Sequence, residues 1–290
     1  MVPTKVKVSF TLAFCIGLLG GFILTAIQDS APHPILSPQA AFSPSVGEQT
    51  APSLSRSRTV QSHGLAVQAA QKQALNEDTV GWLTVPDTGI DDVVLWREGD
   101  NDYYLRRNFD RRHSNSGVYY ADKDCTFGDG TAAALGKNTA IYGHSLSDSK
   151  FDAKFGPMRW YLEEDFARSH PYLYFSTTKE NLVWEVVAVF YSTTGVPYNK
   201  GTLDEDAFAA MFQTVSEQSL YRYSYEYSPD DKFLTLSTCV YSLPDQGALE
   251  YPNEYRLGIM ARLVGNADTL HPDELHTEAD FVRNLHIRPA

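Results

Sequence analysis

The stretch Phe233-Leu-Thr-Leu-Ser-Thr-Cys-Val-Tyr241 decides how this chain is interpreted. Leu234 and Leu236 alternate with polar residues, which is the period of a β-strand that buries one face. The strand ends near Cys239. A free cysteine on a strand is most often a small buried apolar residue. Because Cys239 closes the strand, we also consider that its sulfur emerges at an edge, where it can serve as a nucleophile.

A cysteine nucleophile needs a base or a cation close to its sulfur. Among the eight histidines, His144 is the best placed, because it follows an expected strand and a glycine in Tyr142-Gly-His-Ser145. Such a setting aims an imidazole from the rim of a barrel, although a rim histidine without a chemical role is the commoner alternative. The other histidines lie in segments that suggest no partner: His33, His63, His113, His170, His271, His276 and His286.

Arg256 is the third candidate, near the start of the expected strand 255–264. Leu257 and Ile259 alternate there with Arg256, Gly258 and Met260, so the pattern predicts that Arg256 lies on a polar face. If 240–254 is a connecting loop, Arg256 comes within reach of Cys239. A guanidinium stays charged and can orient a carbonyl or stabilise an oxyanion. A surface ion pair is the more common fate of an arginine.

The remaining β signals predict a fold that is mainly β with helices. Strands are expected at 82–85 and 93–96, separated by a turn rich in proline, aspartate and glycine. Further short strands are expected at 138–142, 172–175 and 182–191, with a broken helix at 155–166. This density of short strands and turns favours a closed or nearly closed β-barrel.

Two further helices are expected, a short one near 65–75 and a long one over 203–220, before the cysteine strand. Thr202 and Glu205 form a T-x-x-E pattern, which predicts a capping box at the start of the long helix. Its apolar residues recur at helical spacing and are interpreted as core packing: Phe208, Met211, Phe212 and Val215.

The N-terminal segment predicts a membrane anchor. Residues 8–27 contain no charge over 20 positions, enough for a helix to cross a bilayer core of about 30 Å. Lys5 and Lys7 precede it, so we expect a single-pass protein in the cell membrane with a cytoplasmic N-terminus and an extracellular catalytic domain. A cleaved signal peptide is the alternative, although its apolar region is usually shorter.

The expected domain organisation follows from these signals. Residues 28–63 are rich in Pro, Ser and Ala and are interpreted as a flexible stalk. The boundaries are a cytoplasmic stub and transmembrane anchor at 1–27, the stalk at 28–63, a catalytic domain at 64–265 and a C-terminal tail of uncertain structure at 266–290.

Composition excludes several classes of function. The chain has 24 basic and 36 acidic residues, a formal net charge of −12, so nucleic acid is not an expected partner. Its three cysteines show no C-x-x-C spacing, which argues against a zinc site. A bridge between Cys125 and Cys239 remains open as an alternative. No P-loop and no G-x-G-x-x-G is present, so we expect no cofactor and no metal.

Taken together, these segments resemble the sortase family. Residues 235–239 (Thr-Leu-Ser-Thr-Cys), 142–144 (Tyr-Gly-His) and 256–263 (Arg-Leu-Gly-Ile-Met-Ala-Arg-Leu) look like its three signature segments. Other stretches resemble class B sortases in particular: 80–86, 100–105, 108–110, 114–120 and the helix 203–220. The resemblance covers roughly residues 65–264.

This resemblance implies a sortase β-barrel and a membrane-anchored cysteine transpeptidase, a thiol protease in the hydrolase class, outside a Gram-positive cell. Cys239 would be the nucleophile, His144 the general acid and base, and Arg256 the group that positions substrate and stabilises the oxyanion. In the family, a thiolate attacks the carbonyl of a threonine in a C-terminal sorting motif of a secreted protein. A peptidoglycan-precursor or pilin amine then resolves the thioacyl enzyme.

The resemblance also suggests residues that line the peptide groove, namely Asn101, Leu105, Ser237 and Thr238. The chain departs from the family in two places. The connection between Cys239 and Arg256 is longer than in some relatives, and Tyr241 stands where some class B members have an acid.

Three other functions stay open at this point. A pilus-assembling sortase and a cysteine peptidase that releases its acyl group to water would both use the same barrel. An anchored extracellular binding module, in which Cys239 is incidental, belongs to a different class.

Overall fold

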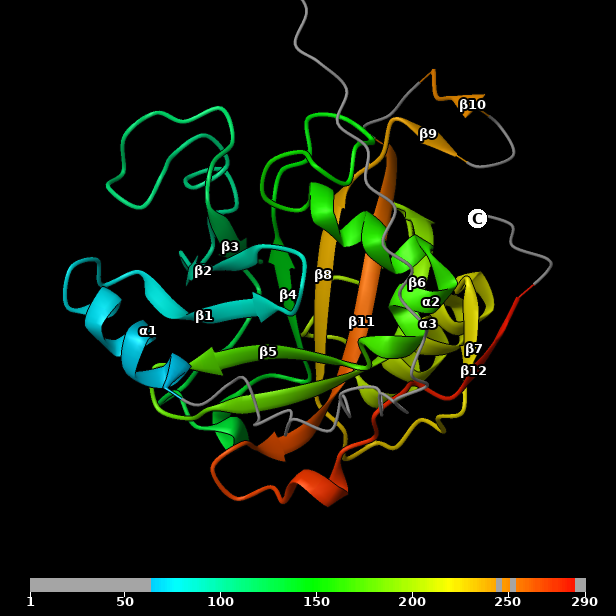
Figure 1. Ribbon diagram of the computed structural model, residues 1–290. Coiled ribbons are helices and arrows are strands. Elements are labelled where there is room, and N and C mark those ends of the chain that lie inside the picture. Colours follow the sequence, from blue (N-terminus) through cyan, green and yellow to red (C-terminus); the bar gives the residue numbers. More distant parts are fainter. Residues whose placement is uncertain (1–63, 244–246, 251–253, 285–290) are drawn as a thin grey trace, which may run out of the picture. The chain divides into compact units, whose positions relative to one another are not determined.

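A computed structural model of the chain describes residues 64–243, 247–250 and 254–284. Eight of its strands form a closed barrel in the order β1-β2-β3-β4-β8-β11-β6-β5 (Figure 1). These are β1 Thr79–Val85, β2 Ile90–Leu95, β3 Tyr119–Ala121, β4 Asn138–Tyr142, β5 Tyr172–Thr177, β6 Leu182–Thr193, β8 Phe233–Cys239 and β11 Tyr255–Asn266. The expected mainly β barrel with helices is confirmed, and several strands extend beyond the ranges expected from the sequence.

Most neighbouring strands of the barrel are antiparallel, but two pairs are parallel. β2 pairs with β3 in parallel, and β4 pairs with β8 in parallel. The interior is filled by apolar side chains from all around the barrel, including Leu234 and Leu236 of β8. The expected inward direction of these two leucines is therefore confirmed.

Helices lie outside the barrel. α1 Leu65–Gln73 packs near β1 and β5, and the expected broken helix consists of the 3₁₀ helix η2 Gly156–Leu162 followed by α2 Glu164–Ser169. Its break falls at Glu163, whose backbone is extended. A second 3₁₀ turn, η1 Ala132–Ala134, precedes β4.

The long helix α3 Glu205–Gln218 covers the outer face of the barrel. Its expected apolar stripe is confirmed, because Phe208 and Val215 are fully buried and pack in one cluster with Phe233 and Met260 of the sheet. The expected capping box is wrong. Asp204 is the N-cap, and its carboxylate accepts a hydrogen bond of 2.9 Å from the Ala207 N–H. An aspartate at the N-cap satisfies that donor and carries its charge at the positive end of the helix, so Thr202 is not needed there.

The outward face of β11 is less polar than its alternation predicted. Gly258 and Met260 share the face of Arg256, yet both are buried, because α3 and Phe190 cover them. Arg256 lies at the end of the strand and is only half-buried. The helix therefore covers one end of this face, while the end with Arg256 stays open.

The C-terminal region has structure that the sequence left undefined. β12 Phe281–Arg283 pairs antiparallel with β7 Tyr221–Tyr223, after the short turn η4 Pro272–Glu274. Phe281 is buried against Tyr221. The part of the tail up to residue 284 thus packs against β7.

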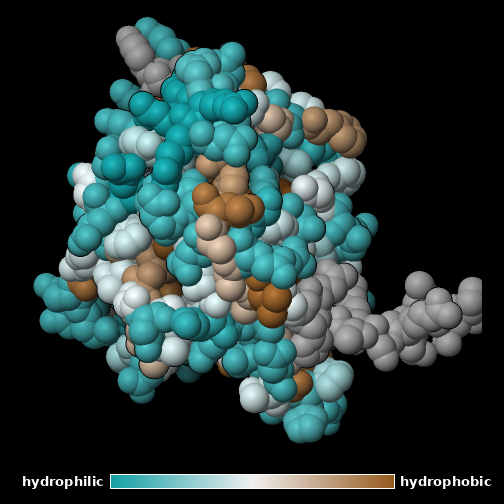
Figure 2. Space-filling view, turned by 90° about the vertical axis from the view of Figure 1, so that its left-hand side faces the viewer, coloured by the Kyte–Doolittle hydropathy of each residue, from teal (hydrophilic) through white to brown (hydrophobic). Residues whose placement is uncertain are grey.

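The expected anchor at 8–27 and stalk at 28–63 lie outside the described residues, and the domain boundaries remain predictions. In the part of the chain that the structure does describe, none of the helices combines the length and the apolar character needed to cross a bilayer. The surface on the left of Figure 1 is mostly hydrophilic, with apolar residues gathered in a narrow central band (Figure 2).

Replacement of Gly258 by alanine is expected to destabilise the barrel where Phe190 packs on β11. A Cβ at this position would lie 2.3 Å from the Phe190 ring, so the ring or the strand must shift. Overpacking of this kind costs about 1–3 kcal/mol of the free energy of unfolding, which urea denaturation measures. Gly195→Ala is the control, because its Cβ would meet only the Thr193 hydroxyl at 3.6 Å. Equal stability of the two variants would contradict this packing.

Candidate active site

Strand register brings the three candidate residues into one row. β8 and β11 are antiparallel, with Cys239 directly opposite Arg256. β4 and β8 are parallel, with Tyr142 opposite Ser237, and His144 follows Tyr142 by two residues as Cys239 follows Ser237. Residues opposite one another in neighbouring strands project to the same face. The order β4-β8-β11 therefore places Cys239 between His144 and Arg256.

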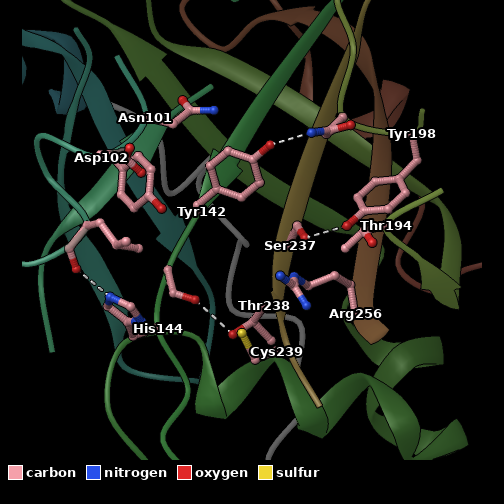
Figure 3. Close-up of a pocket in the computed structure, with 14 residues that line it drawn as sticks. Asn101, Asp102, Tyr142, His144, Thr194, Tyr198, Ser237, Thr238, Cys239 and Arg256 are labelled. Atoms are coloured by element: carbon pink, nitrogen blue, oxygen red, sulfur yellow. Dashed lines mark hydrogen bonds between the residues drawn. The ribbon is translucent and has the colours of Figure 1, made fainter. Parts of the chain in front are cut away.

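The row opens into a cleft of about 240 Å³. Cys239, His144 and Arg256 all line it, and all three are half-buried. The expected groove residues line it too: Asn101, Leu105, Ser237 and Thr238. The structure therefore gathers every residue of the predicted site in one cavity. Figure 3 labels all of them except Leu105. Their roles remain predictions.

A hydrogen bond orients the imidazole of His144. Its Nε2 lies 2.6 Å from the backbone carbonyl oxygen of Leu105. A carbonyl can only accept, so Nε2 carries a proton and donates it. Gly117, at φ 59°, packs against the ring, where an added Cβ would lie 3.1 Å from Cδ2. Nδ1 is consequently the ring nitrogen that is left to take up or release a proton.

The strand ends under the row are joined by hydrogen bonds. The Thr238 hydroxyl donates to the Gly143 carbonyl over 2.8 Å, and the Ser237 hydroxyl lies 3.0 Å from the Tyr198 hydroxyl. Both side chains are almost fully buried. As their hydroxyls already have partners, these residues shape the floor of the cleft more than they offer free groups to it.

Arg256 approaches the cysteine from β11. Its Nη1 donates to the Tyr255 carbonyl over 2.8 Å. Figure 3 shows the guanidinium turned toward the side of the cleft where Cys239 and Thr238 lie. A permanent cation beside a nucleophile can stabilise negative charge on a substrate oxygen.

A network of hydrogen-bonded polar side chains on another wall of the cleft was not predicted from the sequence. The Tyr142 hydroxyl donates to Asp122 over 2.6 Å and accepts from Asn199, while Asn101 donates to the same carboxylate oxygen over 3.0 Å. Burial raises the pKa of Tyr142 well above its usual value, so the phenol stays neutral. Tyr142 belongs to the Tyr-Gly-His segment, so its place beside the site could have been predicted from that motif. Asn199 lies in an irregular segment, and no sequence pattern pointed to it.

Cys125 is a different kind of cysteine. It is buried in the barrel core, with its sulfur 3.7 Å from the Ala140 carbonyl oxygen. Burial raises the pKa of its thiol to about 12. Both Cys125 and Cys239 are free thiols, so the alternative of a bridge between them is wrong. Within the described ranges, no group of three or more His, Cys, Asp or Glu side chains is arranged to hold a metal ion.

Comparison with known proteins points to one family. No protein-family model matches the chain. Sortase B of Listeria monocytogenes is 37% identical over 168 residues, and Sortase B of Staphylococcus aureus is 24% identical over 168 residues. Each match covers 58% of this chain and 65% of the relative, so the chain spans less than two thirds of the length of these curated relatives.

Solved structures extend this likeness. Sortase B from Listeria monocytogenes superimposes with a TM-score of 0.53 and 34% identity, over 67% of this chain and 100% of that one. A Bacillus anthracis protein similar to sortase B gives a TM-score of 0.55 and 29% identity, over 68% and 82%. The Staphylococcus aureus sortase B–substrate complex, with a TM-score of 0.56, 21% identity and coverage of 69% and 86%, is a likeness of fold alone.

Labelling of the folded protein with iodoacetamide is expected to modify Cys239 and to spare Cys125. The sulfur of Cys239 lines an open cleft, whereas Cys125 is buried and its raised pKa keeps it protonated at neutral pH. Peptide mass spectrometry measures the two sites separately. The same reaction in denaturant serves as the control, in which Cys125 must react. Modification of Cys125 at the rate of Cys239 in the folded protein would contradict the burial of Cys125.

Proposed function

This chain belongs to the class B sortases, and on that premise we propose that it cleaves a C-terminal sorting motif after threonine and joins the protein to an amine of the cell wall. The family membership supports a cysteine transpeptidase in general terms. The observation that carries the proposal is the row of His144, Cys239 and Arg256 in one cleft.

The first half of the reaction follows from these positions. The Cys239 thiolate attacks the carbonyl carbon of the substrate threonine, which forms a carbon–sulfur bond and puts negative charge on the carbonyl oxygen. Arg256 donates hydrogen bonds to that oxygen. His144 as imidazolium gives its Nδ1 proton to the departing amine, while its Nε2–H stays on the Leu105 carbonyl. The carbon–nitrogen bond breaks and a thioacyl enzyme remains.

In the second half of the reaction, the proton moves in the opposite direction, from the substrate amine to His144. An incoming amine attacks the thioacyl carbon, and neutral His144 accepts the proton that the amine loses. The carbon–sulfur bond then breaks and a new amide forms. The acceptor we propose is an amine of a peptidoglycan precursor or of a pilin. If water attacked instead, the same site would act as a hydrolytic peptidase.

The proposed location is outside the cell, tethered to the membrane. The uncharged segment 8–27 with its preceding lysines supports an anchor, and the segment 28–63 supports a spacer that lets the domain range over nearby proteins. Asn101 and Leu105 lie on one wall of the cleft, on the segment that also orients His144. We propose that this wall contacts the bound sorting peptide.

A thioacyl enzyme is expected when the full-length chain is mixed with peptides that carry threonine before the cleavage point. Intact-protein mass spectrometry should show an adduct equal to the fragment that ends in threonine, and Cys239→Ala should abolish it. Addition of an amine nucleophile should release the fragment as an amide, whereas a hydrolytic peptidase would release it as an acid. An adduct that persists in Cys239→Ala would refute the assignment of the nucleophile.

Substitution of either neighbour of Cys239 is expected to stop transfer without unfolding the barrel. His144→Ala removes the proton carrier and Arg256→Ala the oxyanion donor, and each loss lowers kcat/KM by about 10²–10⁴-fold. Circular dichroism serves to confirm that the fold persists. Arg256→Lys keeps the charge but loses the fixed fork, so it should recover only part of the rate. A normal rate in His144→Ala would remove that residue from the mechanism.

A further inference from the structure

A buried cation lies behind the row, and the mechanism above does not use it. Arg159, in η2, is 6% exposed. Its Nη1 donates to the Ser145 hydroxyl over 2.8 Å. Its Nη2 donates to the Asp148 carboxylate over 2.7 Å and to the backbone carbonyl of Cys239 over 3.0 Å. One guanidinium thus contacts the residue after His144 and the nucleophile itself.

Asp148, the ion-pair partner of Arg159, also binds the residues that follow Cys239. Its Oδ1 accepts from the Tyr241 N–H over 3.0 Å, and its Oδ2 accepts from the Ser242 hydroxyl over 2.7 Å. Burial by itself would raise the pKa of Asp148, but the hydrogen bonds from Ser242, Tyr241 and Arg159 outweigh it and hold the pKa below its usual value. The carboxylate is therefore charged at neutral pH and stays paired with the guanidinium.

These contacts join two segments that are distant in sequence. Ser145 and Asp148 belong to the loop that follows β4 and carries His144, while Tyr241 and Ser242 follow Cys239. The Tyr241 hydroxyl adds a direct link, because it donates to the Ser145 carbonyl over 2.8 Å. His144 directly precedes Ser145, and Cys239 itself accepts from Arg159 through its backbone carbonyl.

The surroundings leave η2 little freedom to move away. A Cβ added at Gly156, the first residue of η2, would lie 2.9 Å from the Ser149 carbonyl oxygen, so the helix and the loop are in close contact. Within the loop, the Asp152 carboxylate accepts from the Leu146 N–H and the Ser147 hydroxyl. The guanidinium therefore projects from a fixed support into the space between the two segments.

We propose that Arg159 is a positioning residue, which holds the backbone of Cys239 in register with the loop that carries His144. The arrangement needs an arginine, because a planar fork of donors can reach three acceptors from two segments, whereas a lysine offers a single point charge. This inference rests on the proposed function only for the kinetic consequence, since the connection itself is a property of the fold.

The physical reason for a kinetic role is the sensitivity of such reactions to geometry. Displacement of reacting groups by about 1 Å can lower a rate by about 10²-fold. A buried ion pair is, in contrast, weak evidence for stability, because desolvation of the two charges offsets their attraction. Arg159 touches no reacting atom, so its effect must pass through the placement of Cys239 and His144.

Arg159→Met in the full-length chain tests both the connection between the two segments and its effect on the rate. Hydrogen exchange followed by mass spectrometry reads the peptides that contain the Leu146 and Tyr241 amides, and we expect faster exchange in both. Thioacyl formation is measured with the threonine-containing peptide that reacts fastest with the unmodified protein. Its kcat should fall by about 10- to 100-fold, with KM changed by less than about twofold. Arg159→Lys should recover part of the rate.

Arg262→Met is the matched control. Arg262 pairs with Glu185 over 2.6 Å, and it stands opposite Phe233, at the end of the β8–β11 pairing that is far from Cys239. Its loss removes an arginine–carboxylate ion pair that is more exposed than that of Arg159 but should leave the exchange at 145–148 and 239–242 and the thioacyl rate unchanged.

The outcomes separate the inference from the proposed function. Unchanged exchange in Arg159→Met, or a thioacyl rate within about twofold of the unmodified protein, would overturn the positioning role. An equal loss of rate in Arg262→Met would overturn it as well, because the effect would then be one of general stability. If the unmodified protein forms no thioacyl adduct with any peptide, the proposed function fails, and the exchange measurement still decides whether Arg159 joins the two segments.

Discussion

The pairing of β8 with its two neighbours is the constraint on which the site depends. Cys239 stands opposite Arg256 on β11, and the parallel strand β4 delivers His144 on the other side. A slip of one residue in either pairing would turn the affected side chain to the opposite face of the sheet. The closed barrel holds the register, because β8 is hydrogen-bonded along both edges and Leu234 and Leu236 are buried in the interior.

The same face of the sheet packs against a helix at one end and lines the cleft at the other. Phe233 and Met260 lie under α3, where aromatic and aliphatic side chains exclude water. Toward Cys239 and Arg256 the cover ends and the cleft begins. A side chain at position 258 has no room beside Phe190, so glycine separates the two regions. The helix thus supports the strands that carry the site without covering it.

The cleft is supported from two sides by polar groups that do not take part in the proposed chemistry. On one wall, Asp122 orients Tyr142 and Asn101. Behind the row, Arg159 and Asp148 join the segments that follow His144 and Cys239. Loops leave the strands at these points, where register alone no longer fixes the backbone. Hydrogen bonds from buried charged groups, which are strong in a medium of low polarity, supply that order.

The sequence by itself determined the class of fold and the family, and it singled out the three residues that the structure brings into one cleft, whose roles remain predictions. Alternation in 233–241, the Tyr-Gly-His segment and the start of the strand at Arg256 are local patterns, and the barrel and the sortase resemblance were both confirmed. It did not determine the N-cap of α3, the burial of Gly258 and Met260, or the contacts of Arg159. Each of these depends on which segments meet in space. An alternating pattern states which residues share a face, whereas only the tertiary structure decides what covers that face and which distant carbonyl a buried guanidinium reaches.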